Sequence, residues 1–459
     1  MKLRNPNLPD DGRHARRASV LIIVLWIVIG LVAITLYFAN SMTLELRAAD
    51  NRVSGLTAEQ AIEGAARYVG YALVNYVTNG TIPANSKFTC EAVPVGDAHF
   101  WIIGRDPSGT LSTEPHFGLI DEASKLNLNT ANTNMLTYLP NMTSDLAGAI
   151  LDWRSTNGFG SYALNYSSLG YQDKNAPFET VDELRLIYGM TIDILAGDDI
   201  NRNGVLDANE TSSTGGTTPN FGLLEYTTVF SREPNFHADG TSLTNVNNFT
   251  SAEDMNTFFQ TAGVTSDESV ATAIYDTIKP PRGVANPCKS TFDFCLRCLT
   301  NGMSADDFAK IYDNITTTTN LYTYGRVNID TADETVLTAL FTGANIDQQT
   351  GDSAAQTLIA YRQQNPDSLN SPAWMVTALG QNNSLLTALA AHDWITTKSF
   401  QYTADIAAVG PLGRGYRRVK FVFDISDGTP KIIYRQDLSR LGWALGEKAR
   451  ETLLAQNTP

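Results

Sequence analysis

The stretch that decides the fold reads SVLIIVLWIVIGLVAITLYFANSMTL and occupies residues 19–44. It contains no charged side chain, and residues 20–39 are dominated by Val, Ile, Leu and Trp. A helix of about 20 apolar residues is long enough to cross the hydrocarbon core of a bilayer. The sequence therefore predicts a membrane-spanning helix close to the N-terminus.

The charges that flank this stretch predict its orientation. Glu45, Arg47 and Asp50 follow it, and the basic residues that precede it are Lys2, Arg4, Arg13, Arg16 and Arg17. The positive-inside rule leaves the N-terminus in the cytoplasm and everything after about residue 45 outside. A cleaved secretory signal or a plain anchor are alternatives, but a signal has an apolar region of only about 7–15 residues. Here the run continues without proline in a helical pattern, so we predict one helix over residues 19–77.

Composition limits what the rest of the chain can be. Its 459 residues are 43% hydrophobic and 18% charged, which is typical of a globular protein with two or three cores. The net charge of -15 argues against a nucleic-acid partner and is compatible with bound cations. We find no HExxH pair, GxSxG elbow or Walker-type glycine loop. An envelope enzyme would need a pocket that collects Asp or Glu with His99, His116 or His237.

Strand patterns lie on both sides of a long middle segment. Residues 98–105 alternate loosely between apolar and polar, and three further runs near the end of the chain read as strands: 399–406, 417–425 and 431–436. A hairpin-type loop, SDGTP at 426–430, joins the last two runs. We therefore expect an α+β fold, in which the long N-terminal helix packs on an antiparallel pilin-like sheet made from two separated pieces.

The middle segment contains an internal repeat. KLNLNTA at 125–131 and RVNIDTA at 326–332 share one pattern, and TNVNN at 244–248 is a weaker copy. Helical runs follow each copy, and Thr180–Glu183 and Thr331–Glu334 have the spacing of capping boxes. We predict a large inserted α-helical domain of three related units, resembling helix-hairpin-helix or SAM-like repeats.

These blocks give the chain a family resemblance. LIDEASKLNLNTAN (119–132), ILDWR (150–154), KNAPFETVDELRLIYGM (174–190) and GRVNIDTADETVLTAL (325–340) resemble successive blocks of the K-type general secretion pathway protein. That family comprises minor pseudopilins of type II secretion systems, and the resemblance covers nearly the whole chain except about 200–250 and 285–320. It implies a non-enzymatic subunit at the tip of the periplasmic pseudopilus that supports protein export across the outer membrane.

The resemblance also implies a division of the chain, a location and partners. The divisions are a basic prepilin-like leader (1–18), the transmembrane and amphipathic helix (19–77), the first part of the pilin-like β domain (78–117), the inserted helical domain (118–397), and the closing strands with a C-terminal tail (398–459). A single span would hold the chain in the bacterial inner membrane with its bulk in the periplasm. Its partners would be the I-type and J-type minor pseudopilins, other pseudopilins and the prepilin peptidase.

The same resemblance predicts where the leader is cut. Cleavage after Ala18 would make Ser19 the mature N-terminus, although pilins usually have glycine before the cut. Most pilins also carry a glutamate at the fifth mature position, where this chain has Ile23. A carboxylate in an apolar filament core must pair with a positive charge, which in pilins is the amine of a neighbouring subunit. A subunit without this carboxylate therefore has no amine to neutralise in a subunit above it. Ile23 therefore suits a subunit at the tip.

A calcium-type loop, DINRNGVLDANE, occupies residues 199–210. Oxygens fall at loop positions 1, 3, 5, 9 and 12, glycine stands at position 6, and a backbone carbonyl can serve at position 7. The predicted ligands are Asp199, Asn201, Asn203, Val205, Asp207 and Glu210. We expect a structural Ca²⁺ ion with an affinity of roughly 10⁻⁴–10⁻³ M. The alternative is an ordinary Asn/Asp-rich turn, because no clear exit helix follows the loop.

Three clustered cysteines, Cys288, Cys295 and Cys298, leave three interpretations open. One disulfide within the cluster would suit an oxidising periplasm, buried thiols would suit a helical core, and a metal or redox site would need a fourth ligand. Alignment of Thr291 with Thr180 places Cys295 and Cys298 on apolar helix positions. The pairing of the cysteines does not follow from the sequence.

The segment 139–150 resembles a helix-hairpin-helix turn of the kind that binds DNA. The alternative function is therefore a membrane-anchored DNA-binding protein of the competence type. Such turns use glycine so that backbone N–H groups can approach a phosphate, whereas this turn has Asn141, Thr143 and Asp145. We favour a helical hairpin that serves packing or partner contact.

Overall fold

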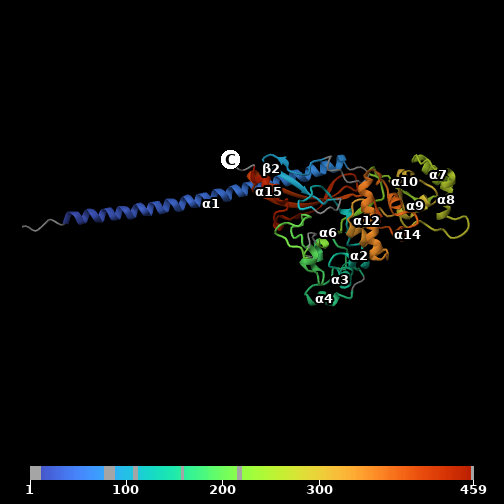
Figure 1. Ribbon diagram of the computed structural model, residues 1–459, viewed down its shortest axis with the longest axis horizontal. Helices are drawn as coiled ribbons and strands as arrows, with labels where there is room; N and C mark the ends of the chain where they lie inside the picture. Colours follow the sequence, from blue (N-terminus) through green and yellow to red (C-terminus); the bar gives the residue numbers. More distant parts are fainter. Residues whose placement is uncertain are drawn as a thin grey trace, which may run out of the picture.

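The computed structural model describes residues 12–76, 88–106, 112–156, 160–213, 215 and 220–455. Its first element, α1 (Gly12–Tyr76), is one continuous helix of 65 residues. In Figure 1 the N-terminal part of α1 extends as a rod, and the rest of the protein gathers around its C-terminal part. The long helix is confirmed, although it begins at Gly12 rather than at residue 19. Residues 1–11 of the predicted leader lie outside the described residues.

The second half of α1 packs on a sheet. Its described side chains are almost all exposed over residues 20–53, and burial of one face begins at Ser54. The apolar residues on the buried face are Ala58, Ala61, Ile62, Ala65, Ala66, Val69, Ala72 and Leu73. Because most of them are small, the helix can lie close to the strands that it covers.

The sheet is antiparallel and joins two distant parts of the chain. Its order is β1-β2-β12-β13-β14, and β3 also pairs with β12. These strands are β1 (Val93–Val95), β2 (Ala98–Ile103), β3 (Ile120–Asp121), β12 (Gln401–Val409), β13 (Arg417–Asp424) and β14 (Lys431–Asp437). Every residue of β12 is buried, and Asp405 on it lies opposite Ile103 on β2. The α+β fold with a sheet made from separated pieces is confirmed.

Between β3 and β12 the chain is mainly helical and has its own apolar core. The α-helices of this part are α2 (Thr133–Tyr138), α3 (Ser144–Arg154), α4 (Ala163–Ser168), α5 (Ile192–Ala196), α6 (Leu223–Tyr226), α7 (Ala252–Thr261), α8 (Glu268–Ile278), α9 (Thr291–Thr300), α10 (Ala305–Tyr312), α11 (Glu334–Gly343), α12 (Gln348–Gln364), α13 (Ala373–Leu379) and α14 (Ser384–Ala390). Its short strands are β4 (Leu126–Asn127), β5 (Thr227–Thr228), β6 (Arg232–Pro234), β7 (Thr244–Asn245), β8 (Ile315–Thr316), β9 (Tyr322–Tyr324), β10 (Val327–Asn328) and β11 (Ile395–Thr396).

Short 3₁₀ turns lie between elements of both the helical part and the sheet, and one more helix follows the sheet. The turns are η1 (Glu122–Ser124), η2 (Val181–Leu186), η3 (Val246–Asn248), η4 (Pro366–Ser368), η5 (Pro411–Gly413) and η6 (Ser439–Leu441). The last helix is α15 (Gly446–Ala455), which lies beside the point where α1 enters the folded body (Figure 1).

The helical part consists of three copies of one unit. In each copy two short strands pair in parallel: β4 with β5, β7 with β8, and β10 with β11. The asparagine that ends the first strand accepts a hydrogen bond from the backbone N–H two residues later, at Asn127, Asn245 and Asn328. The threonine that ends the second strand does the same, at Thr228, Thr316 and Thr396. The predicted triplication is confirmed, and the weak copy at 244–248 is a full unit.

A basic side chain closes each unit. The Arg154 guanidinium donates to the carbonyl oxygens of Leu128 and Ala131. At the equivalent place Arg362 donates to the carbonyl oxygens of Ile329 and Ala332 at 3.1 and 2.6 Å. In the remaining unit a lysine ammonium, that of Lys279, donates to the Phe249 carbonyl oxygen at 2.5 Å. Each of these side chains stands at the end of the second helix of a hairpin (α3, α12 and α8), so it ties the hairpin back to the strand motif.

One of the two predicted capping boxes is wrong. The box of Thr180 and Glu183 is present. Helix α11, however, is capped by Asp333, whose carboxylate accepts from the Val336 N–H at 2.8 Å. The Thr331 hydroxyl instead donates to the buried Asp121 carboxylate at 2.6 Å. Thr331 therefore links this unit to the start of the helical part rather than to its own helix.

Candidate functional site

The predicted calcium loop folds as a closed polar turn between α5 and α6. The Asp199 carboxylate accepts from the N–H groups of Asn203 and Gly204 at 3.0 and 2.7 Å. The Glu210 carboxylate accepts from the Ile200 N–H at 2.9 Å. Gly204 has a φ of 87°, which glycine adopts without steric cost. The glycine at the sixth position is therefore used for the sharp turn that the pattern requires.

The oxygen-bearing side chains of the loop converge, but they contact one another. The Asn201 and Asn203 amides both donate to Oδ2 of Asp207, at 2.5 and 3.1 Å. The Val205 N–H in turn donates to the Asn203 side-chain oxygen at 3.0 Å. Among the described residues, no three His, Cys, Asp or Glu side chains are grouped so that they could hold a metal ion. The ligand types suit calcium, but the two amides would have to turn their oxygens inward to coordinate it.

Burial gives the loop an electrostatic reason to bind a cation. It raises the pKa of the Asp199 carboxyl to about 6, against the attraction of Arg105 and the hydrogen bond from Gly204. The loop also carries the carboxylates of Asp207 and Glu210. A divalent cation would offset the cost of holding these charges away from water.

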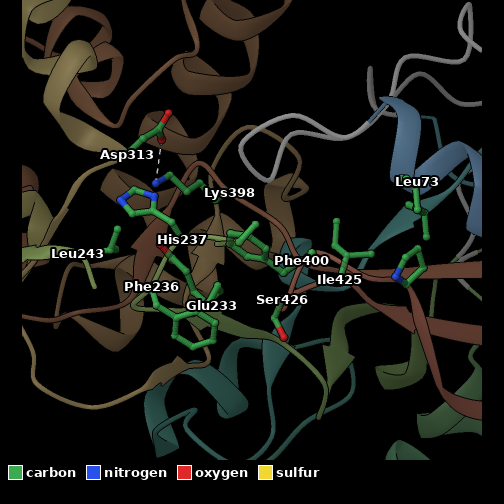
Figure 2. A pocket seen from close by; sticks show the side chains of 15 residues that line it. Leu73, Glu233, Phe236, His237, Leu243, Asp313, Lys398, Phe400, Ile425 and Ser426 are labelled. Atoms are coloured by element: carbon green, nitrogen blue, oxygen red, sulfur yellow. Dashed lines mark ion pairs between the residues drawn. The ribbon is translucent and has the colours of Figure 1, made fainter. Parts of the chain in front are cut away.

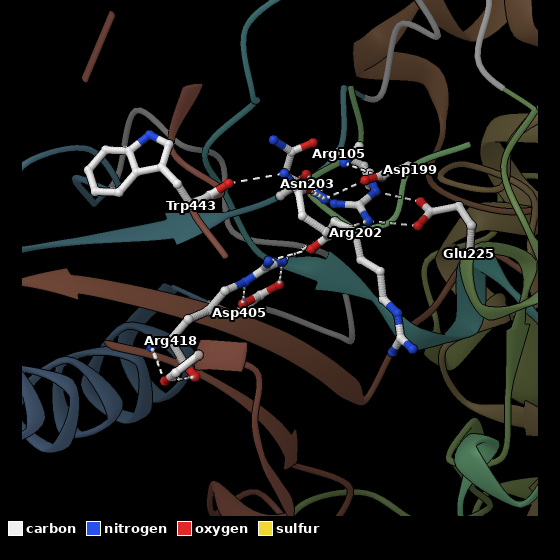
Figure 3. Close-up of polar contacts among 12 residues, drawn as sticks. Arg105, Asp199, Arg202, Asn203, Glu225, Asp405, Arg418 and Trp443 are labelled. Carbon is white, nitrogen blue, oxygen red and sulfur yellow. Dashed lines mark hydrogen bonds and ion pairs between the residues drawn. The ribbon is translucent and has the colours of Figure 1, made fainter. Parts of the chain in front are cut away.

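Two guanidinium groups, one buried (Arg418) and one partly buried (Arg105), hold the loop on the sheet (Figure 3). Arg418 on β13 forms a two-point ion pair with Asp405 at 2.8 and 2.6 Å, and it donates to the Arg202 carbonyl oxygen at 2.8 Å. Arg105 forms a second pair with Glu225 at 2.5 and 2.7 Å and donates to the same carbonyl at 3.3 Å. Although burial disfavours its charge, the Glu225 carboxyl has its pKa lowered to about 2 by Arg105.

The loop also reaches the C-terminal segment. The Asn201 amide donates to the Trp443 carbonyl oxygen at 3.0 Å, and Arg418 donates to the Asn201 carbonyl oxygen at 2.5 Å. Sequence reasoning missed Arg105, Arg418 and Trp443, because no local spacing connects them with the loop. The loop is thus a junction of the helical part, the sheet and the segment before α15.

The four cysteines are buried as unbridged thiols: Cys90, Cys288, Cys295 and Cys298. Burial raises the pKa of Cys288 to about 12 and that of Cys295 and Cys298 well above the usual value of a thiol. Thiols of this kind are poor nucleophiles and poor metal ligands at neutral pH. The disulfide within the cluster stays a prediction.

The structure corrects the predicted alignment of the cysteine helix by one residue. The Asn247 amide exchanges two hydrogen bonds with the backbone of Cys288, at 2.7 and 3.0 Å. Asn129 makes the same exchange with Phe178, also at 2.7 and 3.0 Å. Position 178 therefore corresponds to position 288, and Ser290, the N-cap of α9, stands opposite Thr180. The prediction had placed the next residue there.

The hairpin turn between α2 and α3 is closed by its own side chains. Asn141 has a φ of 59°, and the Thr143 hydroxyl caps α3. The Asp145 carboxylate lies in the first turn of α3 and accepts from the Tyr162 hydroxyl at 3.3 Å. The basic residue of this hairpin, Arg154, is directed inward to backbone carbonyls. A carboxylate at the helix start would repel a phosphate, so the DNA-binding alternative gains no support here.

A cavity of about 270 Å³ lies between the end of α1, β6 and the β13–β14 hairpin (Figure 2). It collects His237 with Glu233 and Asp313, the residue types that an envelope enzyme would need. Asp313 is paired with Lys398 at 2.8 Å, and Glu233 with Arg326 at 2.9 Å. Both carboxylates therefore serve as ion-pair partners between neighbouring segments, and the cavity gives the enzyme alternative no specific support.

The predicted membrane and processing residues lie on α1. In the part of the chain that the structure describes, α1 is the one helix long and apolar enough to cross a membrane, with a mean hydropathy of 2.9 over an 18-residue stretch. Ala18 and Ser19 fall within this helix. Ile23, at the fifth position after the predicted cut, is 57% exposed, as a residue that faces lipid or neighbouring subunits must be.

Comparison with solved structures gives structural likenesses of low degree. No protein-family model matches the chain, and no curated protein matches it. The fold is similar to a chain of the crystal structure of the GspK-GspI-GspJ complex from the type 2 secretion system of enterotoxigenic Escherichia coli. The TM-score is 0.41 and the identity 10%, over 86% of this chain and 99% of that chain. A likeness of this degree decides neither the family nor the function.

Proposed function

We propose that this chain is a non-enzymatic minor pseudopilin of a type II secretion system. The observation that carries the proposal is α1, whose first half is apolar and exposed and whose second half packs on an antiparallel sheet. Such a helix can hold a subunit in a membrane and later pack against the same helix of other subunits. The ordered sequence blocks between residues 119 and 340 that resemble the K-type family add support from the sequence.

Two features favour a position at the tip of the pseudopilus. Ile23 is apolar where most pilins carry a glutamate, so the chain has no carboxylate to neutralise a subunit above it. The three helical units also make the head bulky beside the end of α1 (Figure 1), and this bulk would hinder stacking of a further subunit. The proposed partners are the I-type and J-type minor pseudopilins and other pseudopilins, and the proposed role is support of protein export across the outer membrane.

The proposed location is the bacterial inner membrane. One span would be formed by the first half of α1, the N-terminus would lie in the cytoplasm, and the folded body would lie in the periplasm. A prepilin peptidase would cut between Ala18 and Ser19 before the subunit joins the filament.

The mature N-terminus tests this proposal. We expect mass spectrometry to show loss of residues 1–18 when the full chain is expressed with a prepilin peptidase, and an intact leader without it. An Ala18→Gly variant, which restores the usual pilin residue, should be cut at the same bond, whereas Ala18→Arg should block the cut. An uncut chain in the presence of the peptidase would contradict the proposal, as would peptidase-independent cleavage near residue 40.

We further propose that the loop at 199–210 binds Ca²⁺ as a structural ion. The residues that would hold it by side-chain oxygens are Asp199, Asn201, Asn203, Asp207 and Glu210, with the Val205 carbonyl as a further ligand. Convergence of these groups and the burial of Asp199 support the proposal. The ion would strengthen a junction at which three parts of the chain meet.

A further inference from the structure

The loop that contains η5 is the first part of the folded body that α1 meets after its apolar segment. Gly410 and Gly415 on this loop lie directly against the helix. A Cβ atom on Gly415 would come within 2.3 Å of the Ser54 carbonyl carbon, and one on Gly410 within 2.4 Å of the Ser54 oxygen. Because burial on α1 begins at Ser54, the η5 loop marks the membrane-proximal end of the body.

Helix geometry places this loop at the level of lipid headgroups. Leu44 is the last residue before the first charge that follows the apolar segment, and Asp50 lies about 9 Å further along the helix axis. The Arg414 guanidinium is 3.7 Å from the Asp50 carboxylate. The interfacial zone of each leaflet is about 5–8 Å thick. A segment as long as residues 20–44 fits a hydrocarbon core of about 30 Å only when α1 is tilted. The same tilt places Asp50, and Arg414 beside it, about 7 Å above the core, at the level of the headgroups.

The tip of the loop has the chemistry of an interfacial anchor. Leu412 is 66% exposed and has a φ of 58°, a left-handed conformation that leucine rarely adopts. Arg414 and Arg417 beside it are exposed. An exposed apolar side chain on the same short loop as two exposed guanidinium groups can enter the acyl boundary while the cations remain at the phosphates.

The charge at the membrane-proximal end of the folded body differs from that of the whole chain. Helix α15 contacts η5 at this end. The exposed basic residues here are Arg47, Arg52, Arg414, Arg417, Arg440, Lys448 and Arg450, and the exposed acidic residues are Glu45, Asp50, Asp437, Glu447 and Glu451. The near balance contrasts with the net charge of -15 of the chain. An anionic surface should therefore repel this end less than the net charge of the whole chain would suggest.

We propose that the loop at 410–417 rests on the membrane surface, with Leu412 in the acyl boundary and Arg414 and Arg417 on anionic phosphate headgroups. This inference rests on the proposed function in one respect, because α1 must span the membrane. The contact sets the height and the orientation of the head above the bilayer for as long as the subunit remains anchored there.

Depth-dependent quenching in lipid nanodiscs tests the contact with the full chain. Leu412→Cys is labelled with a polarity-sensitive fluorophore, since the native cysteines are buried. Lipids that carry a spin label near the headgroup end of the acyl chain should quench this label at least about threefold more than a label at Val284→Cys. Val284 is 88% exposed and lies in the segment between α8 and α9. These two helices lie at the opposite end of the folded body from α15 (Figure 1). Equal quenching at the two positions would overturn the inference.

A third label separates failure of the contact from failure of the anchor. Ile27→Cys lies in the apolar segment and should be quenched by lipids spin-labelled deep in the acyl chain. Quenching at 27 without quenching at 412 overturns the membrane contact alone, whereas no quenching at 27 overturns the anchor and with it the proposed function.

A substitution of Arg414 tests whether the guanidinium groups bind anionic headgroups. Arg414→Gln in the Leu412-labelled chain should reduce the population in contact with the lipid about fivefold, and replacing anionic by zwitterionic lipid should act in the same direction. Quenching at 412 that responds to neither change would show that the guanidinium groups do not bind the phosphates.

Discussion

Asp330 occupies the position that asparagine holds in the other two helical units, as Asn129 and Asn247. Its carboxylate accepts a hydrogen bond from the Trp374 indole N–H at 2.8 Å. Burial raises the pKa of the Asp330 carboxyl well above its usual value. An amide oxygen can accept the same hydrogen bond without the cost of burying a charge.

Asp330→Asn should therefore stabilise the protein at neutral pH. Because the folded-state pKa is raised, the folded state binds the proton more tightly, and stability falls as pH rises from the unfolded pKa of about 4. We expect the free energy of unfolding to rise by about 1 kcal/mol or more near pH 7.5, and to change little near pH 4. Denaturant unfolding at both pH values measures this, and a loss of stability near pH 7.5 would contradict it.

Arg362 offers a second test at the residue scale. Its guanidinium reaches two carbonyl oxygens at once, whereas the lysine ammonium is a point charge on a flexible stem. Arg362→Lys should lower the free energy of unfolding by about 1–2 kcal/mol. The control is Arg185→Lys, where the side chain is about half exposed, with an expected change within about 0.5 kcal/mol. Equal effects of the two changes would show that the two-carbonyl bridge contributes nothing.

At the scale of elements, the sequence predicts what local patterns encode. The apolar run at 20–39 leads directly to α1, and the shared pattern of KLNLNTA and RVNIDTA leads to the three units. What escaped prediction depends on distant partners. Thr331 has the spacing of a cap, yet its hydroxyl goes to Asp121, which lies far away in the chain. No local rule distinguishes a cap from a tertiary hydrogen bond.

The contact between α1 and the η5 loop predicts a contrast between two glycines. Gly415 and Gly380 both have positive φ, 72° and 84°, but only Gly415 has backbone within clashing distance of a Cβ atom. Gly380→Ala should cost about 1 kcal/mol for the backbone conformation alone. Gly415→Ala should cost at least about 1–3 kcal/mol more, because the loop must move away from α1. Thermal or denaturant unfolding of both variants measures the difference, and equal costs would show that the close approach is not required.

At the scale of the whole molecule, the calcium loop connects parts that lie far apart in sequence. Its spacing is local, so the candidate ligands could be predicted, whereas Arg105, Arg418 and Trp443 come from elsewhere and could not. Because these three residues contact the loop from other parts of the chain, binding of an ion to the loop should change the stability of the whole folded body. An ion at this junction would stabilise the sheet and the helical part together.

Calcium should therefore raise the temperature of global unfolding. With about 5 mM Ca²⁺ and an affinity of roughly 10⁻⁴–10⁻³ M, the expected stabilisation is about 1–2 kcal/mol. Calorimetry of protein treated with a chelator and then with Ca²⁺ measures the shift. The matched control, Asp199→Asn combined with Asp207→Asn, should abolish it. A shift of equal size in the control would place the ion elsewhere, and no shift in the unaltered chain would contradict the site.

The central place of β12 in the sheet imposes an order on biosynthesis. Its neighbour β2 is made early, and about 300 residues must follow before Asp405 can meet Ile103. Each helical unit is closed by contacts over a shorter span and can fold in the interval, while the edge of β2 waits unpaired. A chain interrupted before Gln401 would thus keep its helical units and lose the centre of its sheet. A stop codon before residue 401 should therefore produce a protein whose helical units are folded. Its strand β2 would be prone to aggregation, and α1 would have no complete sheet to pack on.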